Sequence, residues 1–262
     1  MKIERITMAD RVRETADDEV AVEAPLEIRV GGKALTVVMR TPGNDVELAR
    51  GFLCAEGLVD GAADIVSIAR PAALTGDEVG NVVDVTLRPG ARAPAGARLF
   101  YASSSCGVCG KNAISALRVR APVVSSSLRV PAATLSALPD RLRGAQPLYA
   151  RTGGVHASGL FAADGTLELA REDVGRHNAL DKIIGWGLAA GRLPFGDRLL
   201  VVSGRVSYEI VQKAIAAGLP LIAAVGAPST LAIDLAEQFE VTLVGFVRDG
   251  GMNVYTHGER VT

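Results

Sequence analysis

The feature that most constrains the fold is a regular alternation of strand-like and helix-like segments in the C-terminal part of the chain. Short apolar runs typical of buried strands alternate there with segments whose apolar residues recur at helical spacing. Helices are expected over residues 174–191, 206–218 and 229–239, and strands over residues 198–205, 220–229, 241–247 and 252–256. Strands separated by helices pair in parallel through right-handed crossovers. The sequence therefore predicts an α/β domain with parallel strands.

The ends of these strands indicate where a ligand would bind. In sheets of this kind, ligands lie outside the carboxyl ends of the strands. Those ends carry SGR at residues 203–205, VGAPS at 225–229 and FVRDGG at 246–251. Because Gly, Ser and Arg suit close contact with phosphate, we expect the functional site at this edge of the sheet.

The N-terminal part of the chain is richer in strands. Two alternating runs that meet at a Gly-Gly pair predict a hairpin over residues 25–40. Residues 44–56 predict a helix capped by Asn44 or Asp45, and residues 81–89 predict another alternating strand. This mixture is typical of a small α+β unit.

A stretch rich in Pro, Gly and Ala at residues 89–97 marks a candidate domain boundary. We expect an N-terminal α+β domain over residues 1–96 and an α/β domain over residues 97–262 that carries a cysteine loop and a cofactor site. Within the second domain, residues 148–173 predict a hairpin around Asp164-Gly165. The two glycines before His156 predict that its imidazole lies on a tight turn between strands.

Composition excludes several classes of function. The net charge of -1 and an aromatic content of 4% argue against nucleic-acid binding and against attachment to a membrane surface. The first twenty residues are charged and lack the apolar stretch of a secretory signal. Three cysteines in a chain of 262 residues do not form a disulfide framework, so a reducing cytoplasm is the expected location.

Two of the cysteines, Cys106 and Cys109, lie in the glycine-rich turn SSSCGVCGK just before a helical pattern. A thiol at a helix start is stabilised as thiolate by the unpaired backbone N–H groups, and Lys111 adds a positive charge. The glycines give a large partner access to the sulfur. These features favour a nucleophilic or sulfur-carrying cysteine.

Three other interpretations of the turn stay open from the residues alone. Half of a zinc site would need a second CxxC or a matching His pair, and neither is present. A thioredoxin-like redox pair fits the strand-turn-helix context. A pair of buried structural cysteines would not need the surrounding serines and glycines. The turn by itself does not specify the reaction.

Four further segments carry residues suited to binding an anion or a phosphorylated group. For each there is a plainer interpretation: a structural histidine, a surface ion-pair network, an ordinary strand-helix loop or a simple β-turn. The candidate binding residues are His156, Asp173, Arg176, His177, Ser203, Arg205, Phe246, Val247, Arg248, Asp249, Gly250 and Gly251.

Together these segments resemble one family, the formate dehydrogenase accessory sulfurtransferases known as FdhD. The resemblance spans roughly residues 25 to 257 and includes RTPGNDVELARGFLCAEGLV near the N-terminus. The other motifs, in chain order, are SSSCGVCGK, TGGVHASGL, REDVGRHNALDKIIG, SGRVSYEIVQKA and APSTLAIDLAEQFEVTLVGFVRDGGMNVYT. The resemblance implies a cytidine-deaminase-like, three-layer α/β/α core preceded by a smaller α+β domain.

The resemblance also implies a sulfur relay. A cysteine desulfurase would load persulfide sulfur onto the CxxC loop, and the protein would pass it to the bis-molybdopterin guanine dinucleotide cofactor before the cofactor enters formate dehydrogenase. The family is dimeric, so a homodimer is expected, with guanine nucleotides as mimics of the cofactor and with no structural metal. The metal in the cofactor is molybdenum or tungsten.

The resemblance assigns roles to individual residues. Cys106 is the expected persulfide cysteine, and Cys109 is the second thiol of the loop. Residues 246–251 align with the cofactor-binding stretch, while the other binding residues are assigned from motif position and chemistry. Two departures stand out: Cys54 is expected to be a core residue, and Gly226 occupies a position where a serine is expected.

Overall fold

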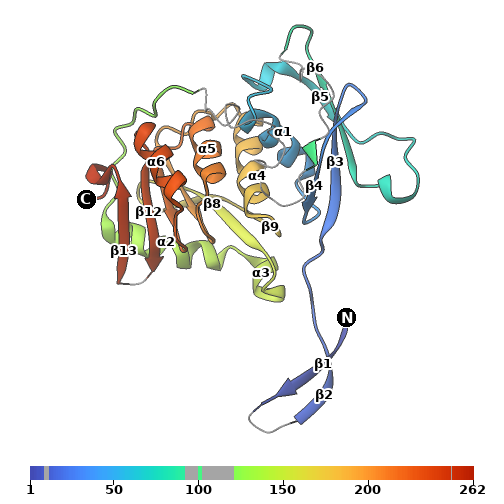
Figure 1. Cartoon of the computed structure of the whole chain (residues 1–262), viewed down its shortest axis with the longest axis horizontal. Coiled ribbons are helices and arrows are strands. Elements are labelled where there is room, and N and C mark those ends of the chain that lie inside the picture. The colour runs from blue at the N-terminus through green and yellow to red at the C-terminus, as the bar shows by residue number, and fades with distance from the viewer. Residues whose placement is uncertain (9–11, 92–99, 102–120, 249) are drawn as a thin grey trace.

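The computed structural model describes residues 1–8, 12–91, 100–101, 121–248 and 250–262. Its largest sheet has six strands in the order β13-β12-β11-β10-β8-β9 (Figure 1). The strands are β8 (His156–Ala162), β9 (Leu167–Asp173), β10 (Arg198–Val202), β11 (Leu221–Ala224), β12 (Thr242–Arg248) and β13 (Gly251–Thr256). The pairs β10–β11 and β11–β12 are parallel, as the alternating pattern predicts, whereas β8, β9 and β13 join in antiparallel pairs.

Helices cover both faces of this sheet. One face holds α4 (Arg176–Ala189), α5 (Tyr208–Ala216) and α6 (Thr230–Gln238), and the other holds α2 (Ala132–Gly144). Alternate residues of β10 divide between the layers: Leu200 and Val202 pack with α4–α6, while Leu199 and Val201 pack with α2. A strand buried on both sides is a continuous apolar run, which is why RLLVV shows no polar alternation.

A second sheet of five strands has the order β5-β6-β3-β4-β7. Its strands are β3 (Ala24–Val30), β4 (Lys33–Arg40), β5 (Ile65–Ala69), β6 (Val82–Leu87) and β7 (Phe100–Tyr101), and α1 (Asp45–Ala55) packs on it. The β3–β4 hairpin confirms the Gly-Gly turn prediction. The N-cap of α1 is Asn44, but the cap makes no side-chain hydrogen bond; Asp45 is buried and pairs with Arg40 instead.

Two strands and three single-turn helices lie outside these two sheets. Strands β1 (Lys2–Thr7) and β2 (Val12–Asp17) form an antiparallel hairpin that extends away from the rest of the molecule (Figure 1). Three single-turn 3₁₀ helices lie at η1 (Ala62–Asp64), η2 (Gly76–Glu78) and η5 (Gly258–Arg260).

The prediction of a strand from residue 148 was wrong, because α3 (Pro147–Thr152) is a helix. Proline at its start fits a helical first turn, and the carboxylate of Glu172 accepts hydrogen bonds from the backbone N–H groups of Leu148 and Tyr149. Glu172 thus caps the start of α3, although it belongs to β9 and lies more than twenty residues away in the sequence. His156 is therefore the first residue of β8 after a helix and not a residue on a turn between two strands.

Helices α1 and α4 pack at very short range through two glycines. A Cβ atom added at Gly51 would overlap the carbonyl oxygen of Asp181, and one added at Gly185 would overlap the carbonyl oxygen of Glu47. The five-stranded sheet and the six-stranded sheet are thus joined through a glycine contact at which two helix backbones touch.

Candidate functional site

The carboxyl ends of β10, β11 and β12 lie in a hydrogen-bonded row. The N–H of Gly226 donates to the carbonyl of Gly204 at 3.1 Å, and the N–H of Phe246 donates to the carbonyl of Gly226 at 3.2 Å. A Cβ atom at Gly226 would lie 2.9 Å from Gly204 O and 3.0 Å from Arg205 N, so the close approach of these loops requires glycine. This explains glycine at the position where the family pattern suggested serine.

His156 joins the same row from β8. Its Nδ1 lies 3.5 Å from the hydroxyl oxygen of Ser203, which in turn accepts a hydrogen bond from the N–H of Ala157 at 2.9 Å. Burial and the neighbouring guanidinium groups of Arg176 and Arg205 lower the pKa of His156. The imidazole is therefore neutral at neutral pH, and the positive charge at this edge comes from the two arginines.

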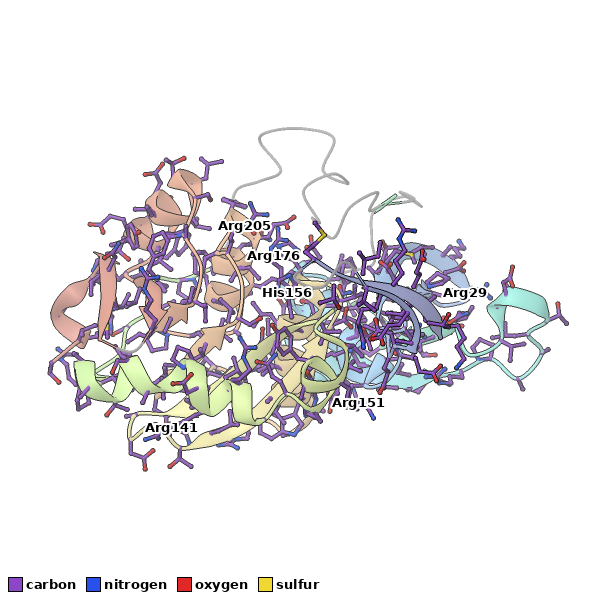
Figure 2. All side chains as sticks on the ribbon, turned by 90° about the horizontal axis from the view of Figure 1, so that it is seen from below. Arg29, Arg141, Arg151, His156, Arg176 and Arg205 are labelled. Atoms are coloured by element: carbon purple, nitrogen blue, oxygen red, sulfur yellow. The ribbon has the colours of Figure 1, made fainter. Side chains whose placement is uncertain are left out.

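Arg176 and Arg205 reach this edge from the start of α4 and from the loop after β10 (Figure 2). Gly204 packs close to both His156 and Arg176, because a Cβ atom there would be 3.2 Å from the imidazole and 3.9 Å from Cδ of Arg176. Arg176 Nε is buried and has no hydrogen-bond partner among the residues that the structure describes. Two arginines, a neutral histidine and closely packed glycine loops make a site suited to an anion.

The loop after β12 forms the far end of the row. An open depression of about 490 Å³ is lined by Phe246, Arg248, Gly250, Gly251, Met252 and Asn253. Phe246 has a φ of 54°, a left-handed conformation that is rare for a bulky residue, and its side chain is 37% exposed. An aromatic ring held in a strained, solvent-facing position beside an arginine suits stacking against a planar base.

Two of the predicted binding residues, Val247 and Asp173, have no exposed surface. Val247 is fully buried in the core beneath α2. Asp173 is also fully buried: its Oδ2 pairs with Lys182 Nζ at 2.7 Å, and its Oδ1 accepts hydrogen bonds from Gly175 N–H and Asn178 Nδ2. The N–H of Thr41 also donates to Asp173, so this carboxylate ties the loop after β4 to the start of α4.

His177 is buried between α4 and α5. Its Nε2 lies 3.1 Å from Ser207 Oγ and 3.1 Å from Glu209 Oε2. Burial, together with Arg176, Lys213 and His156, lowers the pKa of His177 to about 3. Asp181, four residues further along α4, pairs with Lys213 of α5 at 2.8 Å, so both side chains face the same neighbouring helix.

Sequence reasoning missed the buried charges of α5, Glu209 and Lys213. They lie four residues apart on the helix face that also carries apolar core residues. A charged pair on an otherwise apolar helical face is the signal that would have identified them. Burial alone would lower the pKa of Lys213, but the carboxylates of Asp181, Glu56 and Glu209 outweigh it and raise the pKa.

The remaining predicted residues are the two loop cysteines and one aspartate. Cys106, Cys109 and Asp249 lie outside the described residues. Cys54 packs partly buried against the cores of both sheets, as expected. Within the described part of the chain, no group of three or more His, Cys, Asp or Glu residues could hold a metal ion, and none of the described helices could cross a membrane.

Comparison with known proteins identifies the family to which the chain belongs. The sequence matches the model of the FdhD/NarQ family over residues 21–262. The chain belongs to the FdhD/NarQ family. Among curated relatives, the sulfur carrier protein FdhD of Mycolicibacterium paratuberculosis is 51% identical over 250 residues, which cover 93% of this chain and 92% of the relative.

Two further relatives extend over almost the whole of this FdhD/NarQ protein. The sulfur carrier protein FdhD of Nocardia farcinica is 48% identical, with 99% of this chain and 93% of the relative covered. A crystal structure of a protein from Desulfotalea psychrophila, assigned as a formate dehydrogenase accessory protein, superposes with a TM-score of 0.77 at 26% identity, covering 100% of this chain and 98% of that one.

His177 should make the stability of this FdhD/NarQ protein sensitive to acid. Its folded-state pKa of about 3 lies below the ordinary value of 6.5, so the unfolded chain binds a proton more readily between these pH values. Stability from this residue is complete above pH 6.5 and is lost as the pH falls, by on the order of 3 kcal/mol at about pH 4.

Urea unfolding of wild type and His177→Gln at several pH values would measure this effect. Other titrating groups are shared, so the difference between the two curves reports on His177. The variant should lose less stability than wild type on acidification; parallel curves would contradict a buried neutral imidazole.

Proposed function

We propose that this FdhD/NarQ protein is a cytoplasmic sulfur carrier that serves formate dehydrogenase. It would accept sulfur from a cysteine desulfurase and pass it to the bis-molybdopterin guanine dinucleotide cofactor before the cofactor enters the enzyme. The observation that carries the proposal is the row of loops from His156 to Arg248 at one edge of the sheet. The names of relatives at 48% and 51% identity support it.

The chemistry of this edge matches a nucleotide. Arg176 and Arg205 supply guanidinium groups for phosphate oxygens, and the glycine loops allow close approach of the backbone. Phe246 offers an exposed ring for the guanine base, and Arg248 adds a positive charge at that end. Neighbouring strands lie roughly 5 Å apart, so a row that crosses four strands extends over about 14 Å, the scale of a nucleotide.

The cofactor carries two guanine dinucleotide arms, and a homodimer would present two such edges to them. We also assign the six-stranded core to the cytidine-deaminase-like class. Support for this assignment comes from three parallel strands flanked by antiparallel ones, with helices on both faces.

The sulfur steps would follow from thiolate chemistry. The thiolate of Cys106 attacks the terminal sulfur of the desulfurase persulfide, forming Cys106–S–SH and releasing the desulfurase thiolate. Attack by the Cys109 thiolate on Sγ of Cys106 would then release the terminal sulfur as hydrosulfide for the cofactor and leave a Cys106–Cys109 disulfide. A dithiol reductant would restore both thiols.

Mass spectrometry of the protein after incubation with a cysteine desulfurase and free cysteine tests this proposal. The peptide that contains Cys106 should gain the mass of one sulfur atom, and dithiothreitol should remove it. A reaction without desulfurase serves as the control. Absence of the gain, or its appearance only on Cys54, would contradict a relay through the CxxC loop.

A further inference from the structure

The adjacent starts of α4 and α5 hold buried polar groups that the described residues leave without partners. The side chain of His177 is only 4% exposed, yet its Nδ1 has no hydrogen-bond partner in the described part of the chain, and neither has Nε of Arg176. A buried polar atom without a partner is costly, by about 1–3 kcal/mol each. Two such atoms on consecutive residues at the start of α4 therefore suggest a bound group that forms hydrogen bonds with both.

The two helix starts also lack side-chain caps. The N-cap residues of α4 and α5, Gly175 and Ser207, make no side-chain cap hydrogen bond, whereas Ser229 caps α6 by accepting from Ala232 N–H. The Ser207 hydroxyl contacts His177 instead. The first backbone N–H groups of α4 and α5 thus add donors beside Arg176.

The tautomer of His177 follows from its neighbours. Nε2 makes its hydrogen bond with Ser207 Oγ, and Glu209 Oε2 lies 3.1 Å from Nε2 without hydrogen-bond geometry. A lone pair on Nε2 would be repelled by this nearby oxygen, so the electrostatic contact favours the tautomer with the hydrogen on Nε2. Glu209 also lies close enough to the Lys213 ammonium, which pairs with Asp181, to raise the pKa of Lys213. Because the imidazole is neutral, its Nδ1 is an acceptor that needs a donor.

We infer that His177 Nδ1 accepts a hydrogen bond from the bound ligand and that Glu209 is a positioning residue that fixes the required tautomer. The ligand group at this point must combine an anionic atom, for Arg176 and the helix N–H groups, with an O–H, N–H or S–H donor for His177. This inference rests on the proposed function, in which the sugar-phosphate part of a guanine nucleotide supplies such a group.

Two substitutions of His177 distinguish the role of its Nδ1 from the role of its Nε2. Asparagine places its side-chain oxygen near the position of Nδ1 and so keeps an acceptor there. Glutamine places its amide near Nε2, where it keeps the contacts with Ser207 and Glu209 but loses the acceptor. Both remove the ring, so a purely structural role predicts similar effects on folding for the two variants, which thermal unfolding would check.

GDP binding by calorimetry would then be measured for wild type and both variants. Because the nucleotide supplies the donor, His177→Gln should weaken GDP binding about tenfold or more, while His177→Asn, which keeps the acceptor, should weaken it much less. Unchanged GDP binding in His177→Gln, or equal GDP affinities of the two variants, would overturn the inference.

The role of Glu209 has a spectroscopic readout. Nitrogen-15 NMR of labelled histidine distinguishes the two neutral tautomers, and the His177 signals can be assigned from their loss in His177→Asn. Wild type should show the Nε2–H form alone, and Glu209→Gln should show a mixture with weaker GDP binding. The same tautomer in both proteins would remove Glu209 from this role. None of these GDP and NMR measurements requires sulfur transfer, so they remain decisive if the relay itself fails its test.

Discussion

Cys106→Ala is expected to abolish sulfur delivery to formate dehydrogenase while leaving GDP affinity within about twofold of wild type. The reason is chemical: a persulfide needs a sulfur atom to carry it, and no other group in the loop can form the S–S bond at that position. The proposed nucleotide-binding edge consists of His156, Arg176, Arg205 and Phe246, and the substitution replaces none of these residues. The measurement is the activity of formate dehydrogenase matured with each variant.

Cys54→Ala provides the matched control. Cys54 is partly buried in α1, and burial, with Asp181 nearby, raises the pKa of its thiol to about 11. The thiol is therefore protonated at neutral pH and a poor nucleophile, so this variant should retain full sulfur delivery. Full activity of Cys106→Ala would show instead that the protein shelters the cofactor without moving sulfur.

Gly185→Ala is expected to destabilise the protein by roughly 3 kcal/mol or more. Alanine normally improves a helix by about 1 kcal/mol over glycine, but here its methyl group would overlap the backbone carbonyl of Glu47 in α1. A backbone atom cannot rotate out of the way as a side chain can. Helices α1 and α4 would have to separate, and the core residues around them would lose contact.

Gly144→Ala is the matched control for this packing effect. Gly144 also lies in a helix, at the end of α2, and a Cβ atom there would meet nothing within 4 Å. Its substitution should be neutral or stabilising by about 0.5 kcal/mol. Urea unfolding of both variants gives the comparison. Equal midpoints would show that the two helices can move apart at little cost.

The sequence by itself determined the architecture of the α/β core. Buried strands and amphipathic helices are local patterns, and the rule that parallel strands need helical crossovers converts their order into a topology. For the same reason the candidate site was placed at residues 203–205, 225–229 and 246–251, whose loops do lie in one row. His156, Arg176 and Arg205 also lie close together at that edge. The motifs named these residues as binding candidates, but the sequence does not give the distances between them.

Only the tertiary structure decided which polar residues are fully paired inside the protein and which are not. Asp173 and His177 are four residues apart in one motif. Asp173 is enclosed by Lys182, Thr41 and Asn178, whereas Nδ1 of His177 has no hydrogen-bond partner among the described residues. The helical state of residues 147–152 likewise depends on the carboxylate of Glu172. The groups that bury or pair with these residues come from segments far apart in the chain. A local sequence pattern does not show which distant groups will contact a given residue.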